Sequence, residues 1–476
     1  MNTTLVLLPF FVYLGAITCD LLYQALLRRR TGAAISAREE ALGPRGYGTL
    51  TIAMTLAASN LGPADTLALS EQGAKYGVFF LMFPLCAALQ HIFSGFLFAG
   101  RLQEIQNENM TIGDVLFHSF GRGTQFLAGL VTVAQALAFT GVLALAGGQI
   151  LNAFLGWSLP WAILATALFV AAYTGVGGMA AVVSSDRIQM GFLTFAGAIA
   201  GVAAISLLVS NTSIIEPEWL WNPDKTEFSV RMMLSLACGY FLGEALLPMY
   251  SIRAMMAASP SSAKRAFVIG GCFMAVWYAT MIVVGISSHL LSEPQTGTSL
   301  LFVNVLASIT SIAWLRSLLA GVAMVGLLAL THSTLDSVLN AGASSLAKDV
   351  LGAYVKLSDE SLRSYMRSGV FIIAIIGTVF SIIKQDLIDI LMIGYSVWVP
   401  TIVFPLGFVL VWSKTPKSKN SAVWGIAGGL VGYFVADRIP AFVLPPMLVG
   451  FIANAFAFVV SEYFAQPGKP DNVGAG

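Results

Sequence analysis

The stretch AASNLGPADT, residues 57–66, interrupts an apolar segment that is otherwise long enough to cross a membrane as one helix. Pro63 has no N–H group to bond back to Ser59, and its ring clashes with that turn, so we expect the helix to break at Gly62-Pro63. In hydrocarbon, a break is tolerated only where the freed backbone groups meet other helices, water or a ligand. The stretch therefore predicts backbone dipoles exposed at mid-membrane, with a functionless proline kink as the alternative.

The composition of the chain is that of a polytopic membrane protein. Of 476 residues, 57% are hydrophobic and 10% charged, and the mean hydropathy is +0.81. The net charge is +1, and no block of five like charges occurs, which argues against nucleic acid as a partner. The four cysteines lie in apolar segments without metal-ligand spacing, so buried free thiols are expected rather than disulfides or a zinc site.

Thirteen apolar segments are long enough to be membrane-spanning helices. They cover residues 4–27, 47–73, 76–100, 124–153, 158–176, 183–209, 229–251, 266–290, 313–345, 367–384, 386–412, 421–436 and 439–464. The loops of one face hold a roughly threefold excess of lysine and arginine, Arg253 among them, and such an excess marks the cytoplasmic side. The sequence predicts one multi-pass domain in a plasma or bacterial inner membrane, with its N-terminus outside and its C-terminus cytoplasmic.

Two smaller patterns concern the membrane surfaces. Five tryptophans are expected at the outer ends of spans as interfacial anchors, namely Trp157, Trp161, Trp219, Trp221 and Trp314. On the inner face, residues 110–117 are predicted to form a short helix along the membrane, capped by Thr111 with Asp114 in the reciprocal position. A simple connector is the alternative.

A second interrupted segment lies five spans after the first. The sequence CGYFLGEALLPMYSIR, residues 238–253, carries Gly243, Glu244 and Pro248 in the seventh span. Matching interruptions in two halves of a chain indicate a transporter built from inverted repeats, with its site at the breaks. Each break also has an acidic neighbour, Asp65 or Glu244, and ionisable side chains within spans usually face a cavity or a partner.

The ninth span carries a polar stripe in the sequence LLALTHSTLDSVLNAGASS, residues 327–345. Spacings of three and four residues place these positions on one helix face: Leu330, Ser333, Ser337, Asn340 and Ser344. Oxygen atoms in such a stripe are suited to a hard cation such as Na⁺, together with carbonyls freed at the first break. The alternative is that the hydroxyls bond to their own helix or join two helices.

His332 and Asp336 are further deep ionisable residues of this span. His332 could titrate and make transport sensitive to pH. A neutral histidine bonded to a neighbouring helix is the alternative.

Three motifs together resemble the sodium:solute symporter family. They are residues 58–62, residues 173–182 followed by 185–189, and residues 333–337 closed by Lys348-Asp349. The resemblance implies an all-α, LeuT-like fold, in which a five-plus-five inverted repeat works by alternating access. It places an extra first helix and inner loop at 1–46, the first repeat at 47–209, the second at 229–412, and two C-terminal helices with a short tail at 413–476.

The resemblance also implies the ion sites, and it implies no other cofactor. Carried over by position, the first Na⁺ site uses carbonyls and hydroxyls of Ala58, Leu61, Leu330, Ser333 and Thr334. A second Na⁺ site, present in only some members, would draw on Asp186, Ser333, Asp336 and Ser337.

For the solute, the family pattern points to Asn60, Asp65, Tyr240, Glu244 and Tyr395. Many members have Gly-Gln-Pro where this chain has residues 246–248, Leu-Leu-Pro, so one polar solute contact is missing. Glu244 and Asp65 bring carboxylates instead, which favour a cationic or amine-bearing solute or accept a proton. The alternative is that helix N-termini at the breaks receive a carboxylate group of the solute.

The expected function is secondary active transport, in which inward Na⁺ movement drives uptake of a small polar solute through the lipid bilayer. Proton-coupled symport is one alternative. Another is a transporter-like membrane sensor that signals solute occupancy to a separate partner. An enzyme is disfavoured, because no span offers a metal cluster or a nucleophile with its base.

Overall fold

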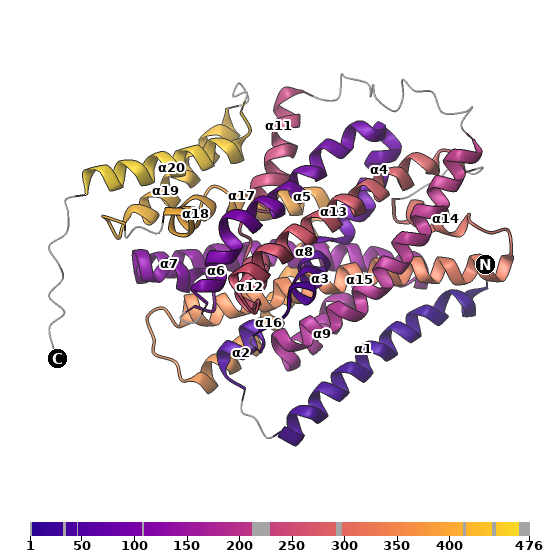
Figure 1. Cartoon of the computed structure of the whole chain (residues 1–476), viewed down its shortest axis with the longest axis horizontal. Coiled ribbons are helices and arrows are strands. Elements are labelled where there is room, and N and C mark those ends of the chain that lie inside the picture. The colour runs from indigo at the N-terminus through magenta and orange to yellow at the C-terminus, as the bar shows by residue number, and fades with distance from the viewer. Residues whose placement is uncertain are drawn as a thin grey trace.

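The computed structural model describes residues 2–31, 35–44, 46–106, 109–211, 229–291, 298–412, 416–439 and 444–465. Over these ranges the chain is built of helices, and its only β-type pairing is an isolated bridge between Tyr47 and Ala257. The first helix lies along one edge of the molecule and the last two lie at the opposite edge (Figure 1). The predicted all-α fold is confirmed.

The N-terminal half contains the first broken span. Its elements are α1 (Thr3–Thr31), α2 (Ala37–Leu42), α3 (Thr49–Asn60), α4 (Pro63–Tyr76), the 3-10 turn η1 (Gly77–Leu81), α5 (Met82–Ser94), the π-helical turn η2 (Gly95–Ala99), α6 (Gly100–Glu104), α7 (Ile112–Phe120), α8 (Arg122–Leu155) and α9 (Leu159–Ser210). The predicted break at Gly62-Pro63 is present, because α3 ends at Asn60 and α4 begins at Pro63.

The second half contains the second broken span. Its elements are α11 (Val230–Cys238), the π-helical turn η4 (Gly239–Gly243), α12 (Pro248–Met256), α13 (Pro260–Ser288), α14 (Thr298–Ala307), α15 (Ala313–Ser345), the π-helical turn η5 (Leu346–Leu351), α16 (Asp359–Ile383), α17 (Leu387–Trp398) and α18 (Val403–Trp412). The helical backbone stops at Gly243 and resumes at Pro248, as predicted. The short helix α14 was not predicted.

The last two helices, α19 (Ser421–Arg438) and α20 (Pro446–Phe464), pack against each other. The Asn454 side chain of α20 donates hydrogen bonds to the carbonyls of Pro400 and Thr401, at 2.7 and 2.8 Å. These bonds attach the C-terminal pair to the bend between α17 and α18.

Prolines explain where several helices begin. Pro63, Pro160, Pro248, Pro260 and Pro446 stand at the first or second position of α4, α9, α12, α13 and α20. The N–H group at the start of a helix has no intrahelical partner, so a proline there loses no hydrogen bond. Its fixed φ also suits a helix. The prolines that interrupt the two broken spans therefore also start their second halves.

The predicted number of thirteen spans is not confirmed. Within the described ranges, nine helices are long and apolar enough to cross a membrane, or ten if the bent α17–α18 pair is one span. The predicted spans 158–176 and 183–209 correspond to the two helical segments of α9, which are separated by non-helical backbone at Gly178. The φ angle of Gly178 is +55°, and a Cβ atom there would lie 2.9 Å from the Glu40 carbonyl oxygen, so the kink requires glycine.

The predicted surface features are present where the structure describes them. Trp157, Trp161 and Trp314 are exposed, whereas Trp219 and Trp221 lie outside the described residues. The helix predicted over 110–117 is α7. The Thr111 hydroxyl accepts from the amide of Asp114 at 3.0 Å, and the Asp114 carboxylate accepts from the amide of Met110 at 3.2 Å.

Candidate functional site

The first break brings a backbone carbonyl of α3 to two hydroxyls of α15. The Ser333 hydroxyl donates to the Ala58 carbonyl at 2.7 Å, and the Thr334 hydroxyl lies 3.4 Å from the same oxygen. Both hydroxyls also lie 3.1 Å from the carbonyl oxygen of Leu330. All these residues are buried. Four of the five predicted ligands of the first Na⁺ site therefore supply adjacent oxygen atoms.

The fifth predicted ligand, Leu61, occupies the break itself. It is fully buried, and its φ and ψ angles of −70° and 86° take it out of the helix. The residue belongs to the same break, but no hydrogen bond joins its carbonyl to the two hydroxyls in the part of the chain described here. The set of neutral oxygens suits a hard monovalent cation, because carbonyl and hydroxyl oxygens are the ligands that such ions prefer.

A charged cluster lies next to these hydroxyls. The Asp336 carboxylate accepts from the Tyr173 hydroxyl at 2.7 Å and from the Ser185 hydroxyl at 3.2 Å. The Ser337 hydroxyl lies 3.1 Å from the other Asp336 oxygen and 3.0 Å from the Ser59 hydroxyl of α3. The predicted residues Asp336 and Ser337 are therefore brought together on the face of α15 that meets α3 and α9.

Arg253 enters this cluster from α12. The sequence places Arg253 in the cytoplasmic loops, and this prediction is wrong, because its side chain is fully buried. Its guanidinium lies 3.4 Å from the Asp186 carboxylate and donates to the Ser337 hydroxyl at 2.5 Å. Thr55 also donates to Asp186. The guanidinium therefore connects Asp186 of α9 with Ser337 of α15, and both residues belong to the predicted second ion site.

The charges of this cluster do not balance. Asp186 and Asp336 bring two carboxyl groups and Arg253 one cation, so the cluster carries one uncompensated negative charge in a fully buried place when both carboxyls are ionised. The Oδ1 atom of Asp186 has no hydrogen-bond partner among the described residues. Burying uncompensated charge is costly, so the arrangement has the capacity for one further cation.

The second break meets the first through a hydrogen-bonded network. The Asn60 amide donates to the Glu244 carboxylate at 3.0 Å, and the Tyr395 hydroxyl donates to the other Glu244 oxygen. Asn60 also donates to the Tyr250 hydroxyl at 2.8 Å and accepts from the Tyr278 hydroxyl at 2.6 Å. Three of the predicted solute residues, Asn60, Glu244 and Tyr395, are therefore in direct contact.

Gly243 explains how Tyr395 reaches Glu244. A Cβ atom on Gly243 would lie 2.7 Å from the Tyr395 ring, so a side chain there would displace the tyrosine. The cavity beside Glu244, Leu246 and Tyr250 measures about 10 Å³, which is room for roughly one water molecule. The network thus fills the space between the two breaks.

The other two predicted solute residues are Tyr240 and Asp65. Tyr240 is partly buried in η4 and packs against the hydrophobic core. Asp65 lies in the first turn of α4, and its side chain is outside what the structure describes. These two assignments remain predictions.

His332 faces away from the predicted ion ligands. Its Nδ1 atom is 2.8 Å from the hydroxyl of Tyr13 in α1, and Phe169 packs against its ring. The geometry matches a histidine bonded to a neighbouring helix.

A sequence model of the Sodium:solute symporter family matches residues 41–432, which is most of the chain. The chain belongs to the sodium:solute symporter family. Its activity is sodium-coupled symport of a small solute, and it is a transporter rather than an enzyme.

Curated relatives of this symporter cover nearly its whole length. The sodium/pantothenate symporter of Escherichia coli (strain K12) is 20% identical over 96% of this chain and 96% of its own length. The sodium/proline symporter of Salmonella typhimurium (strain LT2) is 24% identical over 88% of this chain and 86% of its own.

Solved structures show the fold of the symporter. The substrate-bound outward-open state of a Na⁺-coupled sialic acid symporter matches with a TM-score of 0.78 and 16% identity, over 97% of this chain and 98% of its own. MhsT in complex with L-phenylalanine matches with a TM-score of 0.58 and 16% identity, over 87% and 99%. The predicted LeuT-like fold is confirmed.

The sequence analysis missed three residues of the site. Tyr250 and Tyr278 contact Asn60, and Arg253 contacts Asp186. Tyr250 and Arg253 are three positions apart on α12, just after the second break, so they lie near one helix face. That spacing was visible in the sequence, but a basic residue close to a predicted span end resembles a cytoplasmic anchor.

Proposed function

We propose that this symporter uses the inward movement of Na⁺ to take up a small solute bearing an amino or other cationic group. One observation carries the solute class: Glu244 is a buried carboxylate whose hydrogen-bond partners in the described chain, Asn60 and Tyr395 among them, are neutral. A cation supplied by the solute would compensate that charge.

The first ion of the proposal occupies the oxygens of Ala58, Leu61, Leu330, Ser333 and Thr334. The contacts of 2.7–3.4 Å among four of these residues support it. When Na⁺ enters, the hydroxyl oxygens turn from the carbonyls to the ion, so that α3 and α15 are joined through it. Ion binding then stabilises the arrangement of the first break that also presents Asn60 to the solute.

The second ion of the proposal lies by Asp186, Asp336 and Ser337. Its support is the uncompensated negative charge described above and the unpartnered Oδ1 atom of Asp186. Under this proposal two Na⁺ ions move with each solute molecule, and Arg253 holds the Asp186 carboxylate in place rather than replacing the ion.

The relatives divide between a solute with an amino group, in the sodium/proline symporters, and an anionic solute, in the sodium/pantothenate symporters. The sodium/proline symporter carries an amino acid, which has both a positive and a negative group. In this chain, Glu244 is placed to receive the positive group. The N-terminal end of α12, with its amide groups at the second break, is placed to receive a carboxylate.

The test uses the full chain in proteoliposomes, with sodium and pH gradients imposed separately. Amino acids and other amines are first screened by thermal shift with and without Na⁺, because a bound ligand raises the unfolding temperature. Uptake of a stabilising amine that requires the Na⁺ gradient supports the proposal. Exclusive stabilisation by anions without an amino group would contradict the assigned solute class.

Proton-coupled symport is the second candidate, because Glu244 is a buried carboxylate that could carry the proton instead. In that case a pH gradient alone would drive uptake, and Glu244→Gln would uncouple uptake from pH. In the sodium proposal, the same variant lowers the affinity for amines and leaves the dependence on Na⁺ unchanged.

We also propose that the N-terminus lies outside and the C-terminus in the cytoplasm, because of the charge asymmetry of the loops.

A further inference from the structure

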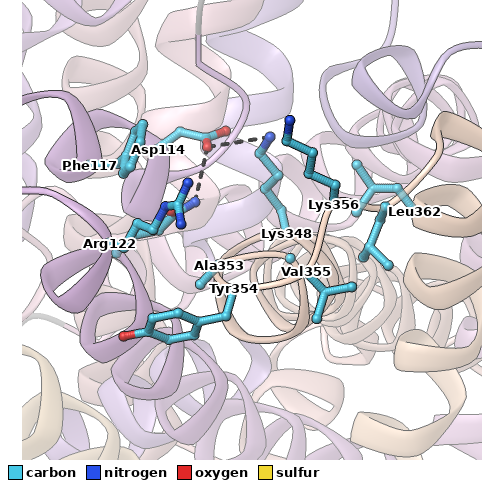
Figure 2. Close-up of a pocket in the computed structure, with 12 residues that line it drawn as sticks. Asp114, Phe117, Arg122, Lys348, Ala353, Tyr354, Val355, Lys356 and Leu362 are labelled. Atoms are coloured by element: carbon cyan, nitrogen blue, oxygen red, sulfur yellow. Dashed lines mark hydrogen bonds and ion pairs between the residues drawn. The ribbon is translucent and has the colours of Figure 1, made fainter. Parts of the chain in front are cut away.

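A second, larger cavity lies away from the two breaks, where α8 begins and α15 ends. Its volume is about 530 Å³, and residues of α7, α8, η5 and the connection from η5 to α16 line it. Figure 2 shows its charged side chains, with Arg122, Lys348 and Lys356 around the carboxylate of Asp114. None of these groups belongs to the ion or solute sites.

The charge of this cavity is positive. Arg122, Lys348 and Lys356 are three cations, and Asp114 is the one carboxylate that lines the cavity with them. The lysine nearest to it, Lys348, is 3.8 Å from Asp114, a loose ion pair. No ion pair of Arg122 or Lys356 is found in the described part of the chain. The lining therefore has an excess of two positive charges, three minus one.

A second carboxylate, Asp349, lies behind the lining and, when ionised, reduces this excess from two to one. Asp349 is fully buried, accepts from the Thr111 hydroxyl at 2.7 Å and is 3.3 Å from the Gln125 amide. Gln125 also donates to Asp114 at 3.3 Å. Asp349 thus holds α7, α8 and η5 together beneath the cavity.

Apolar side chains are exposed beside the cations. Leu351, Tyr354 and Val355 are 44%, 64% and 58% exposed. They follow the end of the apolar helix α15 and its extension η5, and Arg122 is the first residue of the apolar helix α8. Cations beside exposed aromatic and aliphatic groups at the ends of spans are typical of the membrane interface.

We propose that this cavity binds the phosphate headgroup of an anionic phospholipid, with its acyl chains along Leu351, Tyr354 and Val355. The three cations match the headgroup, and the exposed apolar side chains distinguish a lipid from a free phosphate. The volume leaves room for a glycerol phosphate group, since about 10 to 15 Å³ of cavity measured in this way is enough for one water molecule. The bound lipid joins α7 and α8 to the end of α15, the helix that carries Ser333 and Thr334.

The test measures lipid binding to the full chain. The purified protein is titrated with dioleoyl phosphatidylglycerol or dioleoyl phosphatidylcholine, and bound lipid is counted by native mass spectrometry. The wild type is expected to retain phosphatidylglycerol in preference to phosphatidylcholine. In the double variant Lys348→Gln, Lys356→Gln, this binding should weaken about fivefold for each lysine removed. The matched control, Arg265→Gln with Lys417→Gln, removes the same charge from exposed positions outside the cavity and keeps the preference.

Three outcomes would overturn the proposal. They are an unchanged preference in the cavity variant, an equal loss in the control variant, and binding of free glycerol 3-phosphate as tight as that of the lipid. If the double variant does not fold, Lys356→Gln alone decides, because Lys356 makes no ion pair in the described chain and its loss disturbs no internal contact.

Discussion

The hydroxyls of Ser333 and Thr334 are the residues at which the two halves of the site meet. Each contacts carbonyls of two different helices, Ala58 in α3 and Leu330 in α15. If these oxygens bind Na⁺, removing one hydroxyl removes a contact to a charged group, which is worth about 1.5 to 3 kcal/mol.

We therefore expect Ser333→Ala and Thr334→Ala each to raise the Na⁺ concentration for half-maximal uptake by about tenfold or more. The matched control is Thr331→Ala, because Thr331 is a buried hydroxyl of the same helix that bonds only to Leu327 of its own helix among the described residues. Sodium titrations of uptake in proteoliposomes make the comparison. Equal shifts for Thr331→Ala and Ser333→Ala would show a general effect on α15 instead of an ion site.

Arg253 carries the second prediction at the scale of a residue. Replacing it with methionine keeps the apolar volume but leaves Asp186 and Asp336 buried without their cation. Breaking a buried pair in this way costs about 3 to 5 kcal/mol, so Arg253→Met is expected to lower the unfolding temperature markedly. Adding Asp186→Asn to that variant removes one of the two uncompensated charges and should restore part of the loss. A double variant less stable than Arg253→Met would contradict the charge argument.

The residues of the site differ in how far the sequence predicts them. Ser333, Thr334 and Asp336 lie three or fewer positions apart on one helix, so local periodicity is enough to find them. Arg253 and Asp186 are 67 positions apart and meet only because α12 and α9 pack near α3 and α15. A local pattern contains no information about such a contact.

The same distinction holds for helices and their breaks. Pro63 and Pro248 act on their own turn of the backbone, so both breaks were predictable from the sequence. The kink of α9 depends on Gly178, whose positive φ is needed because α2 packs against it. The predicted spans 158–176 and 183–209 are the two helical segments on either side of this glycine, and the angle between them depends on tertiary packing.

Gly178 gives a prediction for this element. In Gly178→Ala, the new Cβ meets the Glu40 carbonyl at 2.9 Å, and the backbone keeps φ and ψ angles of 55° and −158°, which cost a residue with a side chain about 1 to 3 kcal/mol. Glu40 would shift, and its ion pair with Arg367 at 3.0 Å would weaken. We expect a lower unfolding temperature in detergent. Gly191→Ala is the control in the same helix, since nothing lies within 4 Å of its Cβ position, and its effect should be small or stabilising.

At the scale of the whole molecule, the symporter has two regions of unbalanced charge. The cluster of Asp186, Asp336 and Arg253 has two acidic groups for one cation and is buried between α3, α9 and α15. The cavity of Arg122, Lys348 and Lys356 is positive and lies at the ends of α8 and α15. Because α15 passes through both, the proposed lipid at its end and the proposed ions at its middle would act on the same helix.

The pH dependence of lipid binding tests the second region. Burial raises the pKa of the Asp114 carboxyl, and the neighbouring Lys348 opposes that rise. A raised pKa means that the folded protein binds the proton more tightly, so the stability gained from protonation is present at low pH and is lost as the pH rises through the folded value. Protonating Asp114 raises the cavity charge from two to three, and binding of phosphatidylglycerol should therefore tighten as the pH falls, by about fivefold.

The groups that face Asp114 decide how this titration is read. Lys348 forms a loose ion pair with it, Asp349 shares Gln125 and Thr111 with it, and His118 is near enough to interact with it. Native mass spectrometry would compare the wild type with Asp114→Asn and His118→Gln between about pH 5 and about pH 7.5. These limits are set by the ordinary pKa ranges of histidine and carboxyl groups. In Asp114→Asn the affinity should be high and independent of pH, because the cavity lacks its carboxylate at every pH. A full pH response in Asp114→Asn that disappears in His118→Gln would contradict this prediction. It would show that protonation of His118, which lies outside the cavity lining, causes the change in lipid binding.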